Sequence, residues 1–111
     1  MAAGSPSAFE LTMSVDKSPA GAVVNCVGKI TTATVDHLMD QVQPLLVEMK
    51  RVVLDLTQVS FIDSSGLGTM VRLWVSARNA GCEFTVRNLS KRLKDLFTMT
   101  NLNSMFGEDR S

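Results

Sequence analysis

The sequence predicts one α/β domain, with a mixed, mostly parallel sheet of four or five strands and about three helices covering it. Along the chain, segments in which apolar and polar residues alternate, as in strands, are followed by segments whose apolar residues recur every three or four positions, as in helices. This order is typical of parallel strands joined by helical connections. The 111 residues allow one modest core and are too few for two.

An antiparallel hairpin is predicted at the start of the domain. Residues 9–15 alternate apolar and polar side chains, which is typical of a half-buried edge strand. A cluster of turn-forming residues at 16–21 leads into the extended residues 22–27. Gly28 is expected to end this second strand.

A first helix and a core strand are predicted after the hairpin. Apolar residues at helical spacing run to Met49, and Thr32 or Thr34 is suited to cap this helix. Pro44 lacks a backbone N–H, so we expect a kink or a restart of the helix there. Residues 51–56 are almost continuously apolar, as in a central strand covered on both faces, and a loop is expected after them.

A second helix, a further strand and a third helix are predicted next. Asp63 is suited to cap the second helix, which residues 79–81 are expected to stop. Residues 82–86 alternate as a strand does. Ser90 is suited to cap the last helix, and Asn101 is expected to close it.

The two ends of the chain are interpreted separately from the folded part. Residues 1–8 are small and polar and are expected to be a flexible leader, and residues 107–111 a flexible tail. Residues 102–106 have the character of a short last strand. The domain is therefore expected to span residues 9–106.

Composition and charge exclude several classes of function. The chain carries 11 basic and 11 acidic residues, so no net charge draws it to nucleic acid or to an anionic membrane. No apolar run is long enough to span a membrane, and the first residues lack the features of a signal peptide, so we expect a cytoplasmic protein. Cys26 and Cys82 lack the spacing of metal or redox sites and are interpreted as buried free thiols. No metal or other cofactor is predicted.

The segment with the most functional character is the turn before the second helix, Asp63-Ser64-Ser65-Gly66-Leu67-Gly68. Loops that follow parallel strands lie at one edge of the sheet, where helix N-termini present free N–H groups. The two glycines let another surface approach the backbone, although each costs about 1 kcal/mol of helix propensity. We therefore predict an exposed docking turn. The alternative is purely structural: Asp63 caps the helix, the serines bind first-turn N–H groups, and the glycines let the helix pack closely on the sheet.

A catalytic interpretation is also considered and is not favoured. A small hydrolase or nucleotide-binding enzyme would use Ser64 or Ser65, but the sequence offers no general base for either serine. The single histidine, His37, is predicted on the first helix, and no Gly-x-Ser-x-Gly, Walker or His-Glu-x-x-His motif occurs. We interpret the chain as a binding protein and not as an enzyme.

Residues 52–56 and 61–68 closely resemble the STAS domain of bacterial anti-sigma factor antagonists, with Asp-Ser-Ser-Gly-Leu-Gly as the specific core of the match. Supporting matches are Gly28-Lys29-Ile30, Ala80-Gly81-Cys82 and a Leu-Phe-x-x-x-x-Leu ending within residues 93–102. The resemblance covers almost the whole predicted domain.

The resemblance implies a cytoplasmic regulator that binds an anti-sigma serine kinase and so frees a sigma factor. It implies that the kinase phosphorylates Ser64, directly after Asp63, and that a serine phosphatase reverses the modification. It also implies partner contacts by residues 63–68 and by Thr31, which stands where the family commonly has an acidic residue. The alternative within the family is a non-phosphorylated STAS scaffold or transporter-associated subunit that docks permanently. A weak homodimer through an apolar surface near Met70, Trp74 and Met105 is left open.

Overall fold

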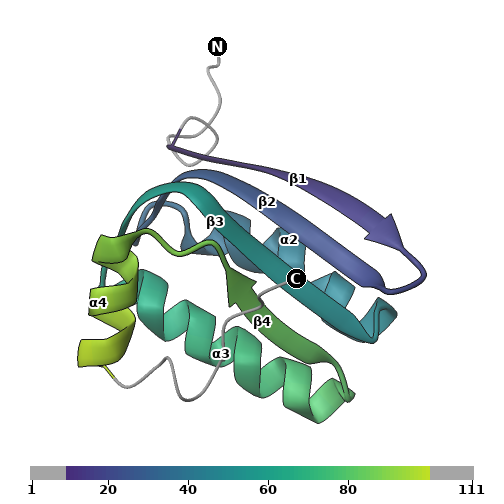
Figure 1. The fold of residues 1–111 in the computed structure, drawn as a ribbon. Helices are drawn as coiled ribbons and strands as arrows, with labels where there is room; N and C mark the ends of the chain where they lie inside the picture. The colour runs from purple at the N-terminus through teal and green to yellow at the C-terminus, as the bar shows by residue number, and fades with distance from the viewer. Residues whose placement is uncertain (1–9, 101–111) are drawn as a thin grey trace.

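The computed structural model describes residues 10–100 and confirms the predicted α/β class. The elements in chain order (Figure 1) are β1 Leu11–Ser18, β2 Gly21–Ile30, α2 Val35–Glu48, β3 Arg51–Ile62, α3 Ser64–Ala80, β4 Glu83–Arg87 and α4 Lys91–Met99. The four strands form one sheet in the order β1-β2-β3-β4. β1 and β2 are antiparallel, and the other neighbouring strands are parallel. The leader, the tail and the predicted last strand at 102–106 lie outside the described residues.

β1 and β2 form the predicted hairpin, with β1 at the edge of the sheet, but the turn predicted at 16–21 is too long, because β1 stays paired with β2 to Ser18. Along β1, buried or half-buried apolar residues alternate with exposed polar ones, so the predicted pattern is confirmed. The prediction that Gly28 ends β2 is wrong, because the strand continues to Ile30. At Gly28 φ is 125°, and an added Cβ would collide with the backbone carbonyl of Glu10. This glycine therefore permits the close approach of the neighbouring chain segment.

β3 is longer than predicted, and the expectation of a loop after Leu56 is wrong. The strand runs over 12 residues to Ile62, because its second half pairs with the end of β2 from Val27 to Ile30. Two register shifts occur along this pairing. They accommodate a second half in which Val59 and the final isoleucine are buried while Ser60 and Phe61 between them are exposed. The apolar first half is buried, as predicted for a central strand.

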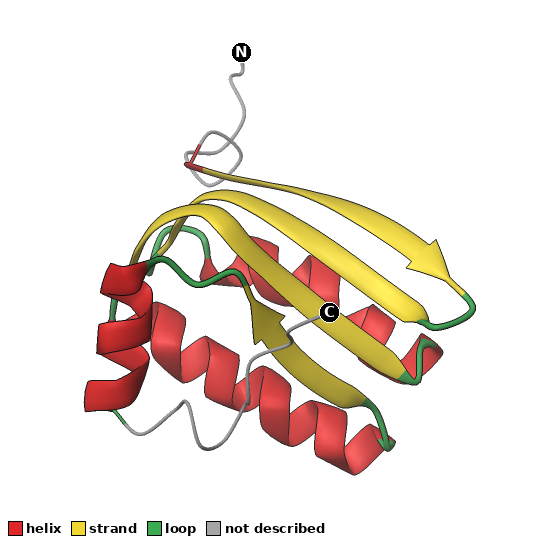
Figure 2. Cartoon of the chain, viewed as in Figure 1, coloured by secondary structure: helices red, strands yellow, loops and turns green. Residues whose placement is uncertain are grey.

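α2 and α3 lie side by side on one face of the sheet, and α4 lies near the start of α3 (Figure 2). Of the kink or restart expected at Pro44, the restart is wrong, because α2 continues as one helix through this residue, which is exposed. Asp63 and Ser90 cap α3 and α4, as predicted, by accepting hydrogen bonds from backbone N–H groups. Gly81 ends α3 with φ at 74°. Within residues 10–100 no helix combines the length and apolarity that a membrane crossing requires.

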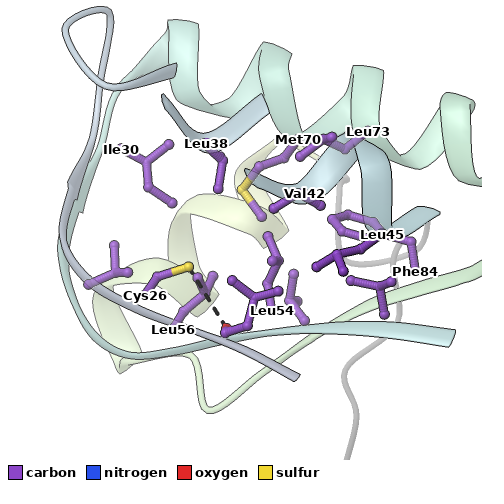
Figure 3. Close-up of a cluster of buried hydrophobic side chains, with 14 of the residues drawn as sticks. Cys26, Ile30, Leu38, Val42, Leu45, Leu54, Leu56, Met70, Leu73 and Phe84 are labelled. Atoms are coloured by element: carbon purple, nitrogen blue, oxygen red, sulfur yellow. Dashed lines mark hydrogen bonds between the residues drawn. The ribbon is translucent and has the colours of Figure 1, made fainter. Parts of the chain in front are cut away.

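The hydrophobic core fills the space between the sheet and the helices (Figure 3). Every second residue of the strands faces it, and α2 and α3 each contribute one apolar face. Cys26 and Cys82 are buried free thiols, as predicted. Burial, with a smaller effect of the nearby Asp55 carboxylate, raises the pKa of Cys26 to about 12. This thiol therefore stays protonated at neutral pH.

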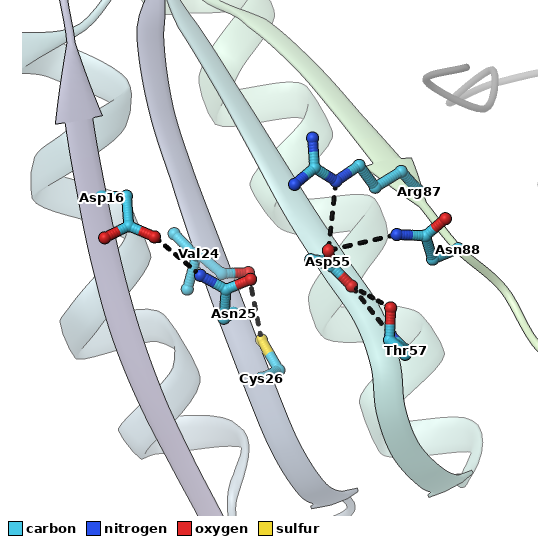
Figure 4. Close-up of polar contacts among 8 residues, drawn as sticks. All are labelled: Asp16, Val24, Asn25, Cys26, Asp55, Thr57, Arg87 and Asn88. Atoms are coloured by element: carbon cyan, nitrogen blue, oxygen red, sulfur yellow. Dashed lines mark hydrogen bonds and ion pairs between the residues drawn. The ribbon is translucent and has the colours of Figure 1, made fainter. Parts of the chain in front are cut away.

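The other face of the sheet carries a polar network centred on Asp55 (Figure 4). One carboxylate oxygen accepts hydrogen bonds from Thr57, and the other accepts them from Arg87 over 3.1 Å and Asn88 over 3.2 Å. Burial alone would raise the pKa of Asp55, but the hydrogen bonds from these residues outweigh it and hold the pKa below its usual value. The network ties β3 to β4 and to the turn before α4.

Candidate functional site

The predicted docking turn lies where β2 and β3 end together. Their last residues, Ile30 and Ile62, are paired in parallel. The loop after β2 and the start of α3 therefore lie next to each other at the carboxyl edge of the sheet. The backbone N–H of Asp63 donates a hydrogen bond to the carbonyl of Ile30 over 3.1 Å, which fixes the two segments to each other.

Asp63 joins these two segments a second time through its carboxylate. Oδ1 accepts a hydrogen bond from the backbone N–H of Gly66 over 2.8 Å, and Oδ2 accepts one from the backbone N–H of Thr32 over 3.2 Å. These bonds, that from Gly66 above all, hold the pKa of Asp63 below its usual value. Asp63 is therefore an ionised bridge as well as the helix cap that the sequence predicted.

The two serines of the turn have different surroundings. The hydroxyl oxygens of Ser65 and Thr32 lie 2.8 Å apart in a hydrogen bond, and Ser65 is half-buried. Ser64 is the first residue of α3 and is exposed, and its hydroxyl has no hydrogen-bond partner among the described residues. Of the two hydroxyls, that of Ser64 is free to meet another molecule.

The two glycines of the turn also differ. Gly66 is buried, and an added Cβ would overlap the carbonyl oxygen of Ile30 and lie 2.9 Å from a methyl carbon of Ile62. At this position the structural alternative holds, because the missing side chain lets α3 pack closely on the sheet. Gly68 is exposed, and nothing lies within 4 Å of an added Cβ. Packing in the described structure therefore does not explain a glycine at position 68.

The loop after β2 is fixed by its own threonines. Thr34 is buried; its hydroxyl donates to the carbonyl of Lys29 over 2.8 Å and accepts from the backbone N–H of Thr31 over 2.9 Å. Thr34 thus precedes α2, as predicted, but its side chain holds the loop and does not cap the helix. The half-buried Thr31, predicted to contact a partner, accepts a hydrogen bond from Ala33 within the same loop.

Thr32 is the residue of the site that sequence reasoning missed. It is exposed and bonded both to Asp63 and to Ser65, whereas the sequence suggested it only as a helix cap. Its place opposite the turn follows from the pairing of β2 with β3 up to their last residues. Because the sequence analysis ended β2 at Gly28, it did not predict this pairing and so did not place Thr32 beside Asp63.

The start of α3 is suited to an anion. The first turn of the helix contains no acidic residue, and the helix dipole favours negative charge there, as the ionised cap Asp63 illustrates. Leu67 of the same turn is half-buried and packs against the core.

The single histidine, His37, lies in the first turn of α2, on the helix where the sequence predicted it. Within residues 10–100 no three potential metal ligands gather. The described site thus consists of hydroxyls, exposed backbone and one ionised carboxylate.

Known proteins resemble this chain in sequence and in fold. The family model of the STAS domain matches residues 12–110. The chain belongs to the STAS domain family. This STAS domain is 33% identical, over 79 residues, to the anti-sigma-B factor antagonist of Bacillus subtilis, and the match covers 71% of the chain and 72% of that protein.

Two solved structures show the same fold as this STAS domain. A crystal structure of an anti-sigma factor antagonist from Mycobacterium paratuberculosis has a TM-score of 0.81 at 20% identity, over 96% of this chain and 89% of that one. The Bacillus cell fate determinant SpoIIAA in its phosphorylated form has a TM-score of 0.69 at 14% identity, over 90% and 93% of the two chains. At these identities the likeness is one of fold.

Proposed function

We propose that this STAS domain is a cytoplasmic anti-sigma factor antagonist. It binds an anti-sigma serine kinase through the turn at residues 63–68, which frees a sigma factor. Phosphorylation of Ser64 by the kinase ends the binding, and a serine phosphatase restores it. The observation that carries the proposal is the exposed hydroxyl of Ser64 beside a Ser65 whose hydroxyl is engaged by Thr32. The name of the Bacillus subtilis relative, an anti-sigma-B factor antagonist, supports it.

The switch is electrostatic in this proposal. A phosphate adds about −1.5 to −2 charges and three acceptor oxygens. On Ser64 it would lie at the N-terminus of α3, where the helix dipole favours negative charge, so the fold tolerates it. A partner surface pressed against the turn would have to desolvate this phosphate next to the ionised Asp63. The domain therefore keeps its fold while the complex dissociates.

The proposed contact surface combines the turn with the loop after β2. Ser64, Leu67 and Gly68 meet the partner, and the absent side chain of Gly68 lets the partner come close to the backbone of α3. Thr31 and Thr32 flank the turn. Asp63, Ser65 and Gly66 belong to the same surface and also give the turn its shape. The domain catalyses no reaction in this proposal, because the kinase transfers the phosphoryl group.

Phosphorylation is tested by incubating the protein with ATP and each candidate anti-sigma serine kinase of the host, followed by intact-mass measurement. One added phosphate is expected on the wild type and on the matched control Ser65→Ala, and none on Ser64→Ala. A phosphate that persists on Ser64→Ala would refute the assignment of the serine. Binding of the kinase with no phosphate added by any host kinase would favour the permanently docked scaffold or transporter-associated subunit.

The charge switch is tested separately from the modification. Ser64→Glu places a carboxylate at the start of α3, and Ser64→Ala removes the hydroxyl without adding charge. We expect Ser64→Glu to bind the kinase at least about tenfold more weakly than Ser64→Ala, which corresponds to about 1.4 kcal/mol. Circular dichroism should show that both variants are folded. Equal affinity of the two variants would contradict the electrostatic mechanism.

A further inference from the structure

An apolar groove lies between the end of β3 and α4, beside the proposed docking turn. Its volume is about 520 Å³, and cavities that hold ligands usually measure about 300–1,000 Å³. The buried residues Ile62 and Leu93 line it together with Phe61 and Met99, which are 45% and 82% exposed. Among the large apolar side chains of the described residues, that of Met99 is the most exposed. We name this surface, formed by residues 61–62 and 91–99, the α4 groove.

α4 carries more apolar residues than its packing against the domain uses. Leu93 and Phe97, four positions apart, are buried in the core. Leu96 and Met99, three positions apart, line the groove together with Leu93, and Leu96 also contacts the edge of the core, whereas Met99 is 82% exposed. Leu96 is only half-buried. Exposed apolar side chains that gather in one hollow indicate an interaction surface, whereas single ones scattered over a surface do not.

The surroundings of the groove are basic. Lys91 and Arg92 line it and are exposed, and no carboxylate among the described residues forms an ion pair with them. Among the described residues of the lining, Asp95 is the only acidic one. Residues 64–100 carry six basic and two acidic side chains, whereas residues 10–63 carry four basic and seven acidic ones. Although the whole chain is neutral, the part that contains α3 and α4 therefore attracts negative charge.

We propose that the α4 groove binds a segment of a protein partner in which a large apolar side chain is flanked by acidic residues. The apolar side chain fills the hollow between Phe61 and Met99, and the carboxylates meet Lys91 and Arg92. This contact uses neither the hydroxyl nor a phosphate of Ser64, so it goes beyond the proposed switch. A partner docked at the turn would reach the groove across Ile62, which directly precedes Asp63.

The test titrates the full ¹⁵N-labelled chain with the acetylated peptide Glu-Asp-Leu-Phe-Glu-Asp and follows amide shifts by NMR. We expect shift changes confined to Phe61 and to α4, with a Kd of about 1 mM or tighter. Two control peptides separate the contributions: Glu-Asp-Ala-Ala-Glu-Asp lacks the apolar anchor, and Lys-Lys-Leu-Phe-Lys-Lys reverses the charge. Both controls should bind at least about tenfold more weakly.

Variants of the groove complete the test. Met99→Glu should abolish binding of the acidic peptide, and the double variant Lys91→Glu/Arg92→Glu should make the basic peptide the better ligand. Val47→Glu is the matched control, because Val47 is 79% exposed and lies near the end of α2, away from the groove. Absent or scattered shifts, or equal affinities for the acidic and basic peptides, would overturn the proposal. So would a concentration-dependent dimer that Met99→Glu disrupts, because the occupant would then be a second copy of the chain.

Discussion

Replacing Gly68 by alanine should stabilise the domain, whereas the same replacement at Gly66 should destabilise it. Both glycines lie early in α3, and alanine is favoured over glycine inside a helix by about 1 kcal/mol. At Gly68 the new methyl group meets nothing within 4 Å, so this gain is retained. At Gly66 the methyl overlaps the backbone carbonyl of Ile30, and such overpacking costs about 1–3 kcal/mol. The two variants should therefore differ in free energy of unfolding by about 1–3 kcal/mol.

The assay is urea unfolding followed by circular dichroism, together with thermal melting. For a domain of this size, 1 kcal/mol corresponds to a shift in Tm of about 4 °C. We expect the midpoint to rise for Gly68→Ala and to fall for Gly66→Ala. If both variants shift in the same direction by the same amount, the packing argument is wrong. Under the proposed function, Gly68→Ala should also bind the kinase more weakly than the wild type although it is more stable.

Three further predictions follow from buried and paired groups. Cys26 and Cys82 should resist iodoacetamide at neutral pH in the folded protein and react once urea unfolds it, because burial raises the pKa of both thiols. The measurement is mass spectrometry, and alkylation of either thiol in the folded protein would contradict this prediction. The folded-state pKa of Asp55 lies below its unfolded value of about 3.9, so its contribution to stability is present above that pH and is lost as the pH falls through the folded value. Urea unfolding over a range of acidic pH should thus show a shallower loss of stability for Asp55→Asn than for the wild type, and identical slopes would argue against the network. The hydroxyl of Thr85 is buried and has no hydrogen-bond partner among residues 10–100. Thr85→Val should therefore leave stability unchanged or raise it by about 1 kcal/mol, and a clear loss of stability in thermal melting would contradict this.

Features of the fold that depend on nearby residues could be predicted from the sequence. The caps at Asp63 and Ser90 and the stop at Gly81 act within a few residues of their own helix, and the structure confirms all three. The second half of β3 could not be predicted in this way. Its residues mix polar and apolar types and become a strand only because β2 offers them backbone partners as far as Ile30.

The same distinction applies to the candidate site. The exposed Ser64 and the capping Asp63 were predictable from the motif and its position before a helix. The roles of Thr32 and of the two glycines were not, because they depend on the distance between α3 and the end of β2. Gly66 and Gly68 are identical in sequence terms, and only the packing around them separates a structural residue from one available to a partner.

The double attachment of Asp63, to its own helix and to Thr32, bears on what kind of substrate the proposed kinase must recognise. The serine that we propose as its target is not part of a loose peptide but the first residue of a helix held against a second loop. A short peptide copied from residues 60–70 would lack that loop and would have to be ordered on binding, which weakens affinity. The kinase would then recognise the folded domain and not the linear sequence around Ser64. A variant that unfolds the domain would therefore prevent phosphorylation even though Ser64 and its neighbours in the sequence are unchanged.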